Sequence, residues 1–476
     1  MKKNHNYKLA VMLLLLVFVW GCHIPKNAMR VENKKMPGGY FRSTNDTVTS
    51  PVKWREYFTD PDLVILIDTA LKNNQEINIV LQEIEIQKNE ILARKGEYLP
   101  SVSLKAAAGA EKTARYTRNG AVEDNLTIAE DKKFPEPLPD FVVGTYASWE
   151  LDVWKKMRNS KKAATARYLA SVEGRNFSIT YIVGEIASAY YELMGLDNHL
   201  DIVKKNIELQ KSILETIQME KDNARLTQLA VNRFQAQLLN TQNLQYEINQ
   251  QIVQVENRIN FLAGRFPQPV KRNSANFYSL NLDSVKTGTP SQLLANRPDI
   301  RQAELELQAA KLDVKSARAN FYPSLSLQAG TGLQSFKPTL LLNPKSILYN
   351  LAGDLVAPLL NRNAIKALYK NASATQIQAV YKYEQTLLNA YIDVMNNVAK
   401  INNLKLSFET KSKEADILTQ SITISTNLFK SARADYAEVL LTQREALESK
   451  IELVEIKMKL LNAKVNVYRA LGGGWH

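Results

Sequence analysis

The sequence contains one cysteine and four histidines among its 476 residues. A single cysteine excludes an internal disulfide framework and a zinc site built from several thiolates, and His5, His23, His199 and His476 are too scattered to predict a histidine metal site. No segment matches the Gly-x-x-x-x-Gly-Lys pattern of a phosphate-binding loop, and no Ser, His and Asp combination stands in a supporting context. We therefore expect no catalysis, no cofactor and no metal.

Glycine and proline are absent from residues 196–263 and from residues 359–471, although the chain has 18 glycines and 16 prolines in all. Both residues interrupt helices, so stretches of 68 and 113 residues without them predict helices much longer than usual. Heptad-spaced apolar residues in these stretches favour narrow coiled-coil seams with polar outer faces. We expect helices at residues 61–96, 155–225, 226–264, 298–321, 359–431 and 434–471.

The N-terminus carries an apolar run that is too short to span a membrane. Three lysines precede the apolar residues 9–20, and Gly21 comes just before the sole cysteine, Cys22. This order is typical of an exported precursor, whereas a spanning helix needs roughly 20 apolar residues. The segment resembles a bacterial lipoprotein signal in which Trp20 replaces the usual small residue. We predict a signal peptide at 1–21 and acylation of Cys22, for example by palmitate; an incidental cysteine after an ordinary signal is the alternative.

The chain repeats part of its own sequence. Residues 97–104 return as residues 320–327 with the same Pro-Ser-x-Ser-Leu ending, at an offset of 223. Residues 262–264 return as residues 471–473, at an offset of 209. Such internal similarity predicts two structural repeats joined by a linker. The predicted divisions are an N-terminal anchor at 22–60, a first repeat at 61–264, a linker at 265–290 and a second repeat at 291–476.

Each half contains segments in which apolar and polar residues alternate, most clearly at residues 143–153. Alternation of this kind is the signature of a transmembrane β-barrel, with one face toward lipid and the other toward a wet lumen; two ordinary soluble hairpins are the alternative. An open sheet would leave backbone groups unpaired in lipid, so the membrane interpretation requires further chains to complete the sheet. The expected strands lie at about 101–110, 142–153, 324–334 and 346–357.

Several segments together resemble one known family. The most specific is Arg297-Pro298-Asp299-Ile300, followed by Ala-Arg-Ala-Asn-Phe-Tyr-Pro-Ser-Leu-Ser-Leu at 317–327; residues 54–74 and the Trp-Glu-Leu-Asp-Val-Trp segment at 149–154 add to it. Over nearly the whole mature chain, they resemble the outer membrane efflux factor family, the TolC/OprM-like exit ducts of tripartite pumps. The resemblance implies a mainly α fold with β strands. Three protomers of four strands each would form a twelve-stranded transmembrane β-barrel, continued by a long periplasmic α-helical barrel.

The same resemblance implies a lipid-anchored, membrane-spanning outer membrane protein that passively conducts substrates from the periplasm to the exterior. Its partners would be two further copies of the chain, a periplasmic adaptor, an inner-membrane transporter of the RND type and outer membrane lipid. Two alternatives stay open: an exit duct for type I protein secretion, and a non-transport coiled-coil structural lipoprotein. The substrate does not follow from the sequence, because the partner pump selects it.

The formal net charge of +13, or +10 without residues 1–21, raises the question of nucleic acid binding. The basic residues are spread along the expected helices among acidic ones, and an exported lipoprotein would not meet genomic DNA. We therefore expect no nucleic acid partner.

By the family pattern, the helices of each half turn back at a periplasmic tip. Arg225, Arg433 and Ala432 are candidates for a surface that docks the adaptor there, although charge stabilisation of a helix end would also explain the arginines. Glu438, with Asp435 nearby, is a candidate for the aperture, because three copies would form an anionic ring; a solvated helix charge is the alternative. Ala432 stands where the family usually has glycine, which makes a positive φ harder to adopt.

Overall fold

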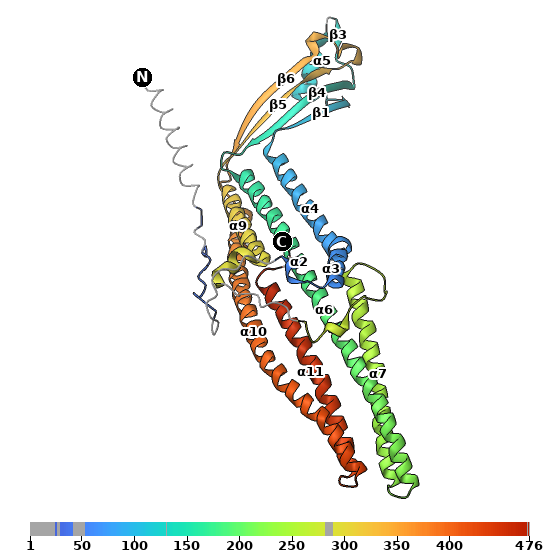
Figure 1. Ribbon diagram of the computed structural model, residues 1–476. Helices are drawn as coiled ribbons and strands as arrows, with labels where there is room; N and C mark the ends of the chain where they lie inside the picture. Colours follow the sequence, from blue (N-terminus) through green and yellow to red (C-terminus); the bar gives the residue numbers. More distant parts are fainter. Residues whose placement is uncertain are drawn as a thin grey trace. The chain divides into compact units, whose positions relative to one another are not determined.

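The computed structural model describes residues 24–25, 29–40, 53–129, 131–280, 289–473 and 475. The fold is mainly helical with one four-stranded sheet (Figure 1). It divides into two compact units, each built from segments of both halves of the sequence. The sheet belongs to the unit formed by Glu85–Leu169 and Leu305–Tyr381 with the N-terminal residues, and the other unit comprises Glu32–Ile84, Ala170–Glu304 and Lys382–His476. Cys22 and the predicted signal peptide lie outside the described residues.

The sheet is antiparallel, with the strand order β1-β4-β5-β6. Its strands are β1 (Ser101–Glu111), β4 (Leu138–Leu151), β5 (Ser324–Ser335) and β6 (Ile347–Val356). β1 and β6 form its two edges. The segment between β1 and β4 contains a short helix, α5 (Arg118–Asn125), and two very short strands, β2 (Thr127–Ala129) and β3 (Lys132–Lys133). The sequence analysis did not anticipate these three elements.

The register of the sheet places the alternating apolar residues on one face. Thr145 pairs with both Leu104 and Thr331, and Thr331 pairs in turn with Tyr349. Since side chains alternate between faces along a strand, every second residue from these positions shares their face. That face carries Val102, Leu104, Val143, Ala147, Trp149, Leu325, Leu327, Ala329, Leu333, Ile347, Tyr349, Leu351 and Leu355. The opposite face is mostly Ser, Gln, Gly, Asn, Asp and Lys.

The expectation of very long helices is confirmed. Two helices exceed sixty residues, namely α6 (Lys156–Asp222), with 67 residues, and α10 (Asn363–Lys430), with 68. Each is followed by a helix of 35 residues, α7 (Gln228–Leu262) and α11 (Tyr436–Ala470) respectively. α9 (Pro298–Ala319) precedes β5. The remaining α-helices among the described residues are the short α2 (Trp54–Tyr57) and α8 (Leu293–Asn296) and the pair described next.

The expectation of a single helix over 61–96 is wrong, because two helices occupy this range. α3 (Pro61–Asn73) and α4 (Gln75–Tyr98) are separated at Asn74, whose backbone is extended. Its side-chain Oδ1 accepts hydrogen bonds from the backbone N–H groups of Glu76 and Ile77, and its Nδ2 donates to the carbonyl of Leu262 at 2.8 Å. Asn74 thus begins one helix while holding the end of α7.

The main apolar core lies in the second unit. Residues from α2 and α3 pack against the middle of α6 and the C-terminal parts of α7 and α11. Tyr57 stacks on Tyr468 with ring centroids 4.3 Å apart, and Tyr190 donates a hydrogen bond to Asp60 at 3.0 Å. Along α6 and α11, Gly184 lies against Arg469 and Gly195 against Met458, so these two helices pack antiparallel in a fixed register.

The ends of α7 and α11 are alike. Gly264 and Gly472 have φ values of +66° and +85°, in the left-handed region that favours glycine. Each faces the backbone carbonyl of an equivalent asparagine, Asn73 or Asn296. The similarity of residues 262–264 to 471–473 had paired Gly264 with Gly473. That pairing is wrong by one residue, because the turn glycine of the second half is Gly472.

Candidate functional site

One candidate site is the sheet, whose apolar face is not covered by any other part of the chain that the structure describes. Leu104 on β1 is 75% exposed, and Tyr349 and Leu351 on β6 are 85% and 80% exposed. Monomeric soluble proteins rarely expose an apolar surface of this extent. The outer edges of β1 and β6 have no strand partner among the described residues. The sheet therefore offers an apolar face and two open edges for which an isolated soluble chain has no use.

The second candidate site is the pair of helix turns where α6 meets α7 and α10 meets α11 (Figure 1). In the first turn, the N–H groups of Ala224 and Arg225 donate to the carbonyls of Lys221 and Glu220. In the second turn, Ala432 and Arg433 repeat the pattern with Phe429 and Leu428. This is the Schellman arrangement, which requires a left-handed residue after the helix. Alanine fills that position in both turns, with φ values of 59° and 56°.

Ala432 thus adopts the positive φ that the sequence analysis expected to be difficult for an alanine. The conformation lowers stability but does not prevent the turn. An alanine in the left-handed region costs about 1–2 kcal/mol relative to a right-handed conformation. The two hydrogen bonds of the motif and the packing behind the turn offset that cost. Ala224, its counterpart, was not singled out from the sequence, although both alanines precede an arginine at the end of a long helix.

A small apolar cluster lies behind the two turns. Ile217 of α6, Phe234 of α7 and Val439 of α11 are each at most 2% exposed. Phe429 and Tyr436 pack against the same cluster from the second hairpin. The turns are therefore held together by side chains of both hairpins, which places their exposed charges at one end of the unit.

Among the predicted site residues, Arg225, Arg433, Asp435 and Glu438 are all exposed. Arg225 forms an ion pair with Glu220 at 3.3 Å. Asp435 is the residue before α11, and Glu438 lies in the first turn of that helix, where a negative charge suits the helix dipole. The structure thus brings the five tip residues, Ala432 included, to the same pair of turns, and among the residues that it describes neither carboxylate has an ion-pair partner.

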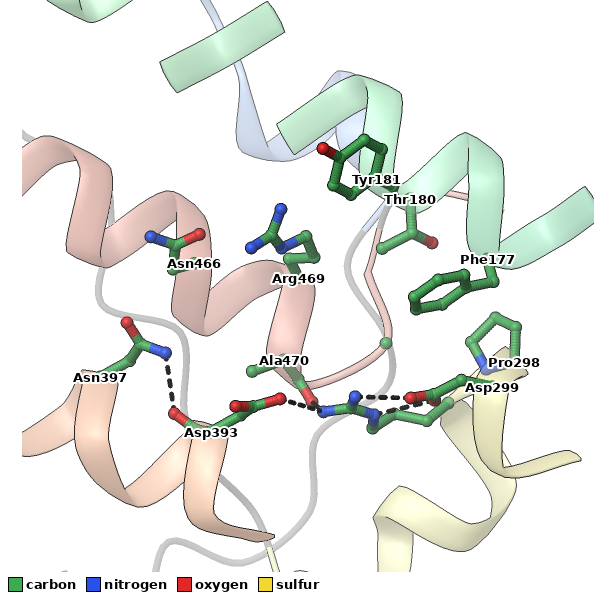
Figure 2. A pocket seen from close by; sticks show the side chains of 12 residues that line it. Phe177, Thr180, Tyr181, Pro298, Asp299, Asp393, Asn397, Asn466, Arg469 and Ala470 are labelled. Atoms are coloured by element: carbon green, nitrogen blue, oxygen red, sulfur yellow. Dashed lines mark hydrogen bonds and ion pairs between the residues drawn. The ribbon is translucent and has the colours of Figure 1, made fainter. Parts of the chain in front are cut away.

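A polar pocket of about 280 Å³ lies at the other end of α11 (Figure 2). Its key residue is Arg297, which is only 8% exposed and forms a forked pair with Asp299 at 2.7 and 3.0 Å. Arg297 also donates to the carbonyl of Ala470 at 3.0 Å and lies 3.7 Å from Asp393. Arg297 belongs to the segment 297–300 that most resembles the family. Its contacts link the start of α9 to the last turn of α11.

The sequence analysis missed Arg272, whose side chain is 15% exposed, and Lys457, which is buried. Arg272 forms a forked pair with Asp197 at 2.6 and 2.8 Å and a further pair with Glu256 at 2.6 Å. Lys457 donates to the carbonyls of Tyr278 and Leu280 at 2.9 and 2.8 Å, and burial lowers the pKa of its ammonium group. Both hold the segment after α7 against the helices. No spacing in the sequence identifies them, because their partners lie far along the chain.

Two further properties of the described residues concern metals and membranes. In those residues, no three His, Cys, Asp or Glu side chains are grouped so as to hold a metal ion. Within the same residues, no helix has an apolar stretch long enough, and sufficiently free of charge, to cross a membrane.

The known proteins to which this chain is similar are outer membrane proteins. The family model described as outer membrane efflux protein matches residues 66–265 and 289–473. The solvent efflux pump outer membrane protein SrpC of Pseudomonas putida is 26% identical over 428 residues, which are 90% of this chain and 88% of SrpC. The probable outer membrane lipoprotein SilC of Salmonella typhimurium is 24% identical, over 89% of this chain and 88% of SilC.

A solved structure shows the same fold. The crystal structure of the open state of the MtrE outer membrane channel from Neisseria gonorrhoeae superposes on this chain with a TM-score of 0.81 at 20% sequence identity. The superposition covers 95% of this chain and 98% of MtrE.

Proposed function

Because the chain belongs to the outer membrane efflux protein family, we propose that it is the outer membrane channel of a tripartite efflux pump and works as a homotrimer. Substrates would pass through it from the periplasm to the exterior without an energy source of its own. A periplasmic adaptor and an inner-membrane transporter of the RND type would supply the energy for transport and select the substrate. Acylation of Cys22 would add a lipid anchor.

The observation that carries this proposal is the four-stranded sheet. Its apolar face suits lipid, its opposite face suits water, and its edges at β1 and β6 are free to pair. Backbone groups at an open edge would each cost several kcal/mol in lipid, so a membrane sheet must close. Pairing of β6 with β1 of a second copy, repeated over three copies, would give the closed twelve-stranded barrel that the family resemblance implies.

Exposed apolar stripes on two helices of the second unit support a ring of copies. On α10, Leu388, Ile392, Leu406, Ile417, Ile424 and Leu428 are exposed at spacings of 4, 7, 11 and 14 residues. Since a helix turns by about 100° per residue, these six side chains lie within about 20° of one direction. On α7, Leu239, Tyr246 and Val253 recur every seventh residue and are also exposed. A monomer has no use for such stripes, whereas packing of α10 against α7 of a neighbouring copy would bury both.

A first experiment tests the channel itself. We expect the purified full-length protein to migrate as a heat-resistant trimer on unboiled gels and to form pores in planar lipid bilayers. Pore formation without a drug or metal phenotype in a deletion strain, but with loss of a secreted protein, would favour type I secretion instead. A trimer without pores would leave the structural lipoprotein as the better description.

A second experiment tests the aperture. We propose that Glu438 and Asp435 of three copies line a narrow anionic ring, so Glu438→Gln should reduce cation preference in single-channel recordings. Glu445→Gln, which removes an exposed charge further along α11, is the matched control and should change little. Unchanged cation preference in Glu438→Gln would refute the ring while leaving the channel assignment intact.

A third experiment tests the docking surface. We propose that Arg225, Arg433 and Ala432 contact the adaptor, because they are exposed together at the two turns. Arg433→Ala should weaken capture of the adaptor in a pull-down, while Lys400→Ala, an exposed cation elsewhere on α10, should not. If Arg433→Ala lowers only the melting temperature, the arginine stabilises the helix end instead.

Loss of palmitate labelling in Cys22→Ser would establish the acylated residue.

A further inference from the structure

At one end of the sheet the strands pass into the helices (Figure 1), and several aromatic side chains lie in contact with backbone or rings there. Trp154 stacks on Tyr322 with ring centroids 4.7 Å apart, and its Nε1 donates to the carbonyl of Pro323 at 2.7 Å. Trp149 donates to the carbonyl of Tyr98 at 3.1 Å. The Trp154 side chain is 46% exposed and lines a cavity of about 260 Å³. Rings with an apolar body and a polar tip are favoured at the level of lipid headgroups.

The helices that start at this level begin with charge of only one sign. Residues 155–172 contain six basic residues and no acidic one, and residues 355–383 contain four basic residues and no acidic one. These ranges are the beginnings of α6 and α10, whose first turns contain no acidic residue. The helix dipole disfavours positive charge at an N-terminus, so helix stability does not explain this distribution. Lys156, Arg158 and Arg167 pair within the chain with Glu150, Asp152 and Asp313, whereas the lysines described next have no such pair among the described residues.

Four lysines of these ranges are available for an anionic partner. Lys155 immediately precedes α6, Lys162 lies in the second turn of α6, and Lys366 and Lys370 lie one turn apart on α10; all four are exposed. Among the described residues, none of the four has an ion-pair partner, whereas the neighbouring Lys156 is paired with Glu150.

Lys155 is also held in an unfavourable backbone conformation. It stands immediately before α6 with a φ of 61°, in the left-handed region where glycine or asparagine is the usual residue. Two residues before α10, the left-handed conformation is adopted by Asn361, with a φ of 47°. A lysine at such a turn is a strained choice, and strain of this kind tends to mark positions kept for a function.

We propose that Lys155, Lys162, Lys366 and Lys370, together with Trp154, bind the phosphate headgroups of anionic phospholipids. This inference rests on the proposed function, because a channel with this sheet in the outer membrane has its helical end at the periplasm-facing, phospholipid leaflet. The lysines supply charge that complements the phosphate, and the ring of Trp154 lies at the boundary between acyl chains and headgroups. The surface thereby fixes the depth of the sheet in the membrane.

Native mass spectrometry of the full-length protein in neutral detergent tests the proposal. With phosphatidylglycerol and phosphatidylethanolamine supplied in equal amounts, we expect the wild type to retain phosphatidylglycerol preferentially. The fourfold variant Lys155→Gln/Lys162→Gln/Lys366→Gln/Lys370→Gln should lose at least tenfold in apparent affinity for phosphatidylglycerol. The matched control Lys204→Gln/Lys400→Gln/Lys405→Gln/Lys413→Gln removes the same charge from exposed positions of the other unit and should bind as the wild type does. Equal retention of phosphatidylglycerol by the wild type and the fourfold variant would overturn the proposal.

A second measurement covers the case in which the fourfold variant does not fold. Brominated phosphatidylglycerol should quench part of the tryptophan fluorescence of the wild type, and the quenched part should be smaller in Trp154→Phe, where Trp149 remains. An unchanged quenched fraction in Trp154→Phe would contradict the proposal. This test is independent of the channel assignment. A protein without the lipid preference can still conduct ions in planar bilayers, and lipid binding can still be measured for a protein that does not conduct.

Discussion

The backbone carbonyl of Asn73 occupies the space that a Cβ atom on Gly264 would need. The same relationship holds between Asn296 and Gly472, in the other half of the chain. In both places a glycine that follows a 35-residue helix, in a left-handed conformation, rests directly on the end of a shorter helix. Glycine is therefore required twice over, by its φ and by the close approach of another backbone.

Replacement of either glycine should be costly. We expect Gly264→Ala to lower the free energy of unfolding by at least about 2 kcal/mol, because the left-handed backbone alone costs an alanine about 1–2 kcal/mol and the carbonyl of Asn73 must also move. Thermal unfolding followed by circular dichroism measures this. Gly96→Ala is the control, because Gly96 lies within α4 with nothing near its Cβ position, and it should stabilise slightly. Equal melting temperatures for wild type and Gly264→Ala would contradict the argument.

At the tip turns, replacing an alanine by glycine should raise stability, in contrast to the loss expected for Gly264→Ala. Ala224 and Ala432 adopt the left-handed conformation that glycine tolerates better, so Ala432→Gly should raise the free energy of unfolding by up to about 1 kcal/mol. The gain is limited because glycine also loses more backbone freedom on folding. Ala446→Gly, inside α11, provides the contrast and should destabilise by about 1 kcal/mol. The expected opposite signs in chemical denaturation separate turn strain from a general effect of glycine.

The pH dependence of stability should include a contribution from His199. Its ring lies buried between α6 and α11 and donates from Nε2 to the carbonyl of Ile451 at 3.0 Å. Burial lowers the pKa of this ring below its usual value, although Glu455 opposes that shift. As the pH falls below about 6.5, the unfolded chain takes up a proton that the folded chain resists, so stability decreases. Above that pH, both states are neutral and the contribution vanishes.

His199→Gln should remove this contribution while keeping a donor near Ile451. The melting temperature of the wild type is expected to fall more steeply than that of the variant between pH 7.5 and pH 5. Differential scanning calorimetry at several pH values checks this, and His476→Gln serves as the control at the chain end. Parallel pH profiles for wild type and His199→Gln would show that the ring is not the titrating group.

The Arg272 network should be a major stabilising element of the segment after α7. Arg272→Ala leaves Asp197 and Glu256 without their main partner, which should cost about 2–4 kcal/mol, somewhat less than for a fully buried pair because both carboxylates are partly exposed. Arg272→Lys should recover only part of this, since an ammonium group cannot form the fork with Asp197. Limited proteolysis at residues 265–280 reports the loosening, and resistance equal to the wild type would rule out the proposed role.

The sequence predicted the long helices and the apolar face of the sheet because both depend on local signals. The stretch 359–471 without glycine or proline spans α10 and α11, and the stretch 196–263 spans α7 and the last part of α6, whose first part contains three glycines. A period of two assigns Val143 and Leu327 to one face of the sheet. The break at Asn74 was missed, since an asparagine within an apolar pattern gives no local sign that its side chain will cap one helix and hold another. Family resemblance, and not residue chemistry, selected the tip residues.

What the sequence could not indicate is contact over long separations. Arg272 and Asp197 are 75 residues apart, and Lys457 and Tyr278 are 179 apart. No periodicity or composition relates such positions, because the pairing depends on how the helices pack. The segment around Arg297 was recognised as a signature, but its task of holding the end of α11 became visible only when Ala470 was placed beside it.

Two glutamines interrupt the apolar seam between α6 and α11. The contact of Gly195 with Met458 sets an antiparallel register in which the numbers of facing residues add to 653, and the same register places Gln210 opposite Gln443. Gln443 is fully buried and Gln210 is 2% exposed. Among the described residues, neither amide has a hydrogen-bond partner. Apolar clusters lie on both sides of this level, around Ile207 in one direction and around Ile217 in the other.

The layer formed by Gln210 and Gln443 should contribute less to stability than any other layer of the contact between the two hairpins. An unsatisfied buried amide costs about 1–3 kcal/mol, so Gln210→Leu/Gln443→Leu should raise the free energy of unfolding by about 1–3 kcal/mol, while each single variant gains less because one amide stays unpaired. A double-mutant cycle in chemical denaturation measures this, with Leu447→Gln as the reverse control that should destabilise a neighbouring apolar level. If both single variants instead destabilise strongly and the double variant is no better, the glutamines bond to each other in the folded protein and the seam is weakest elsewhere.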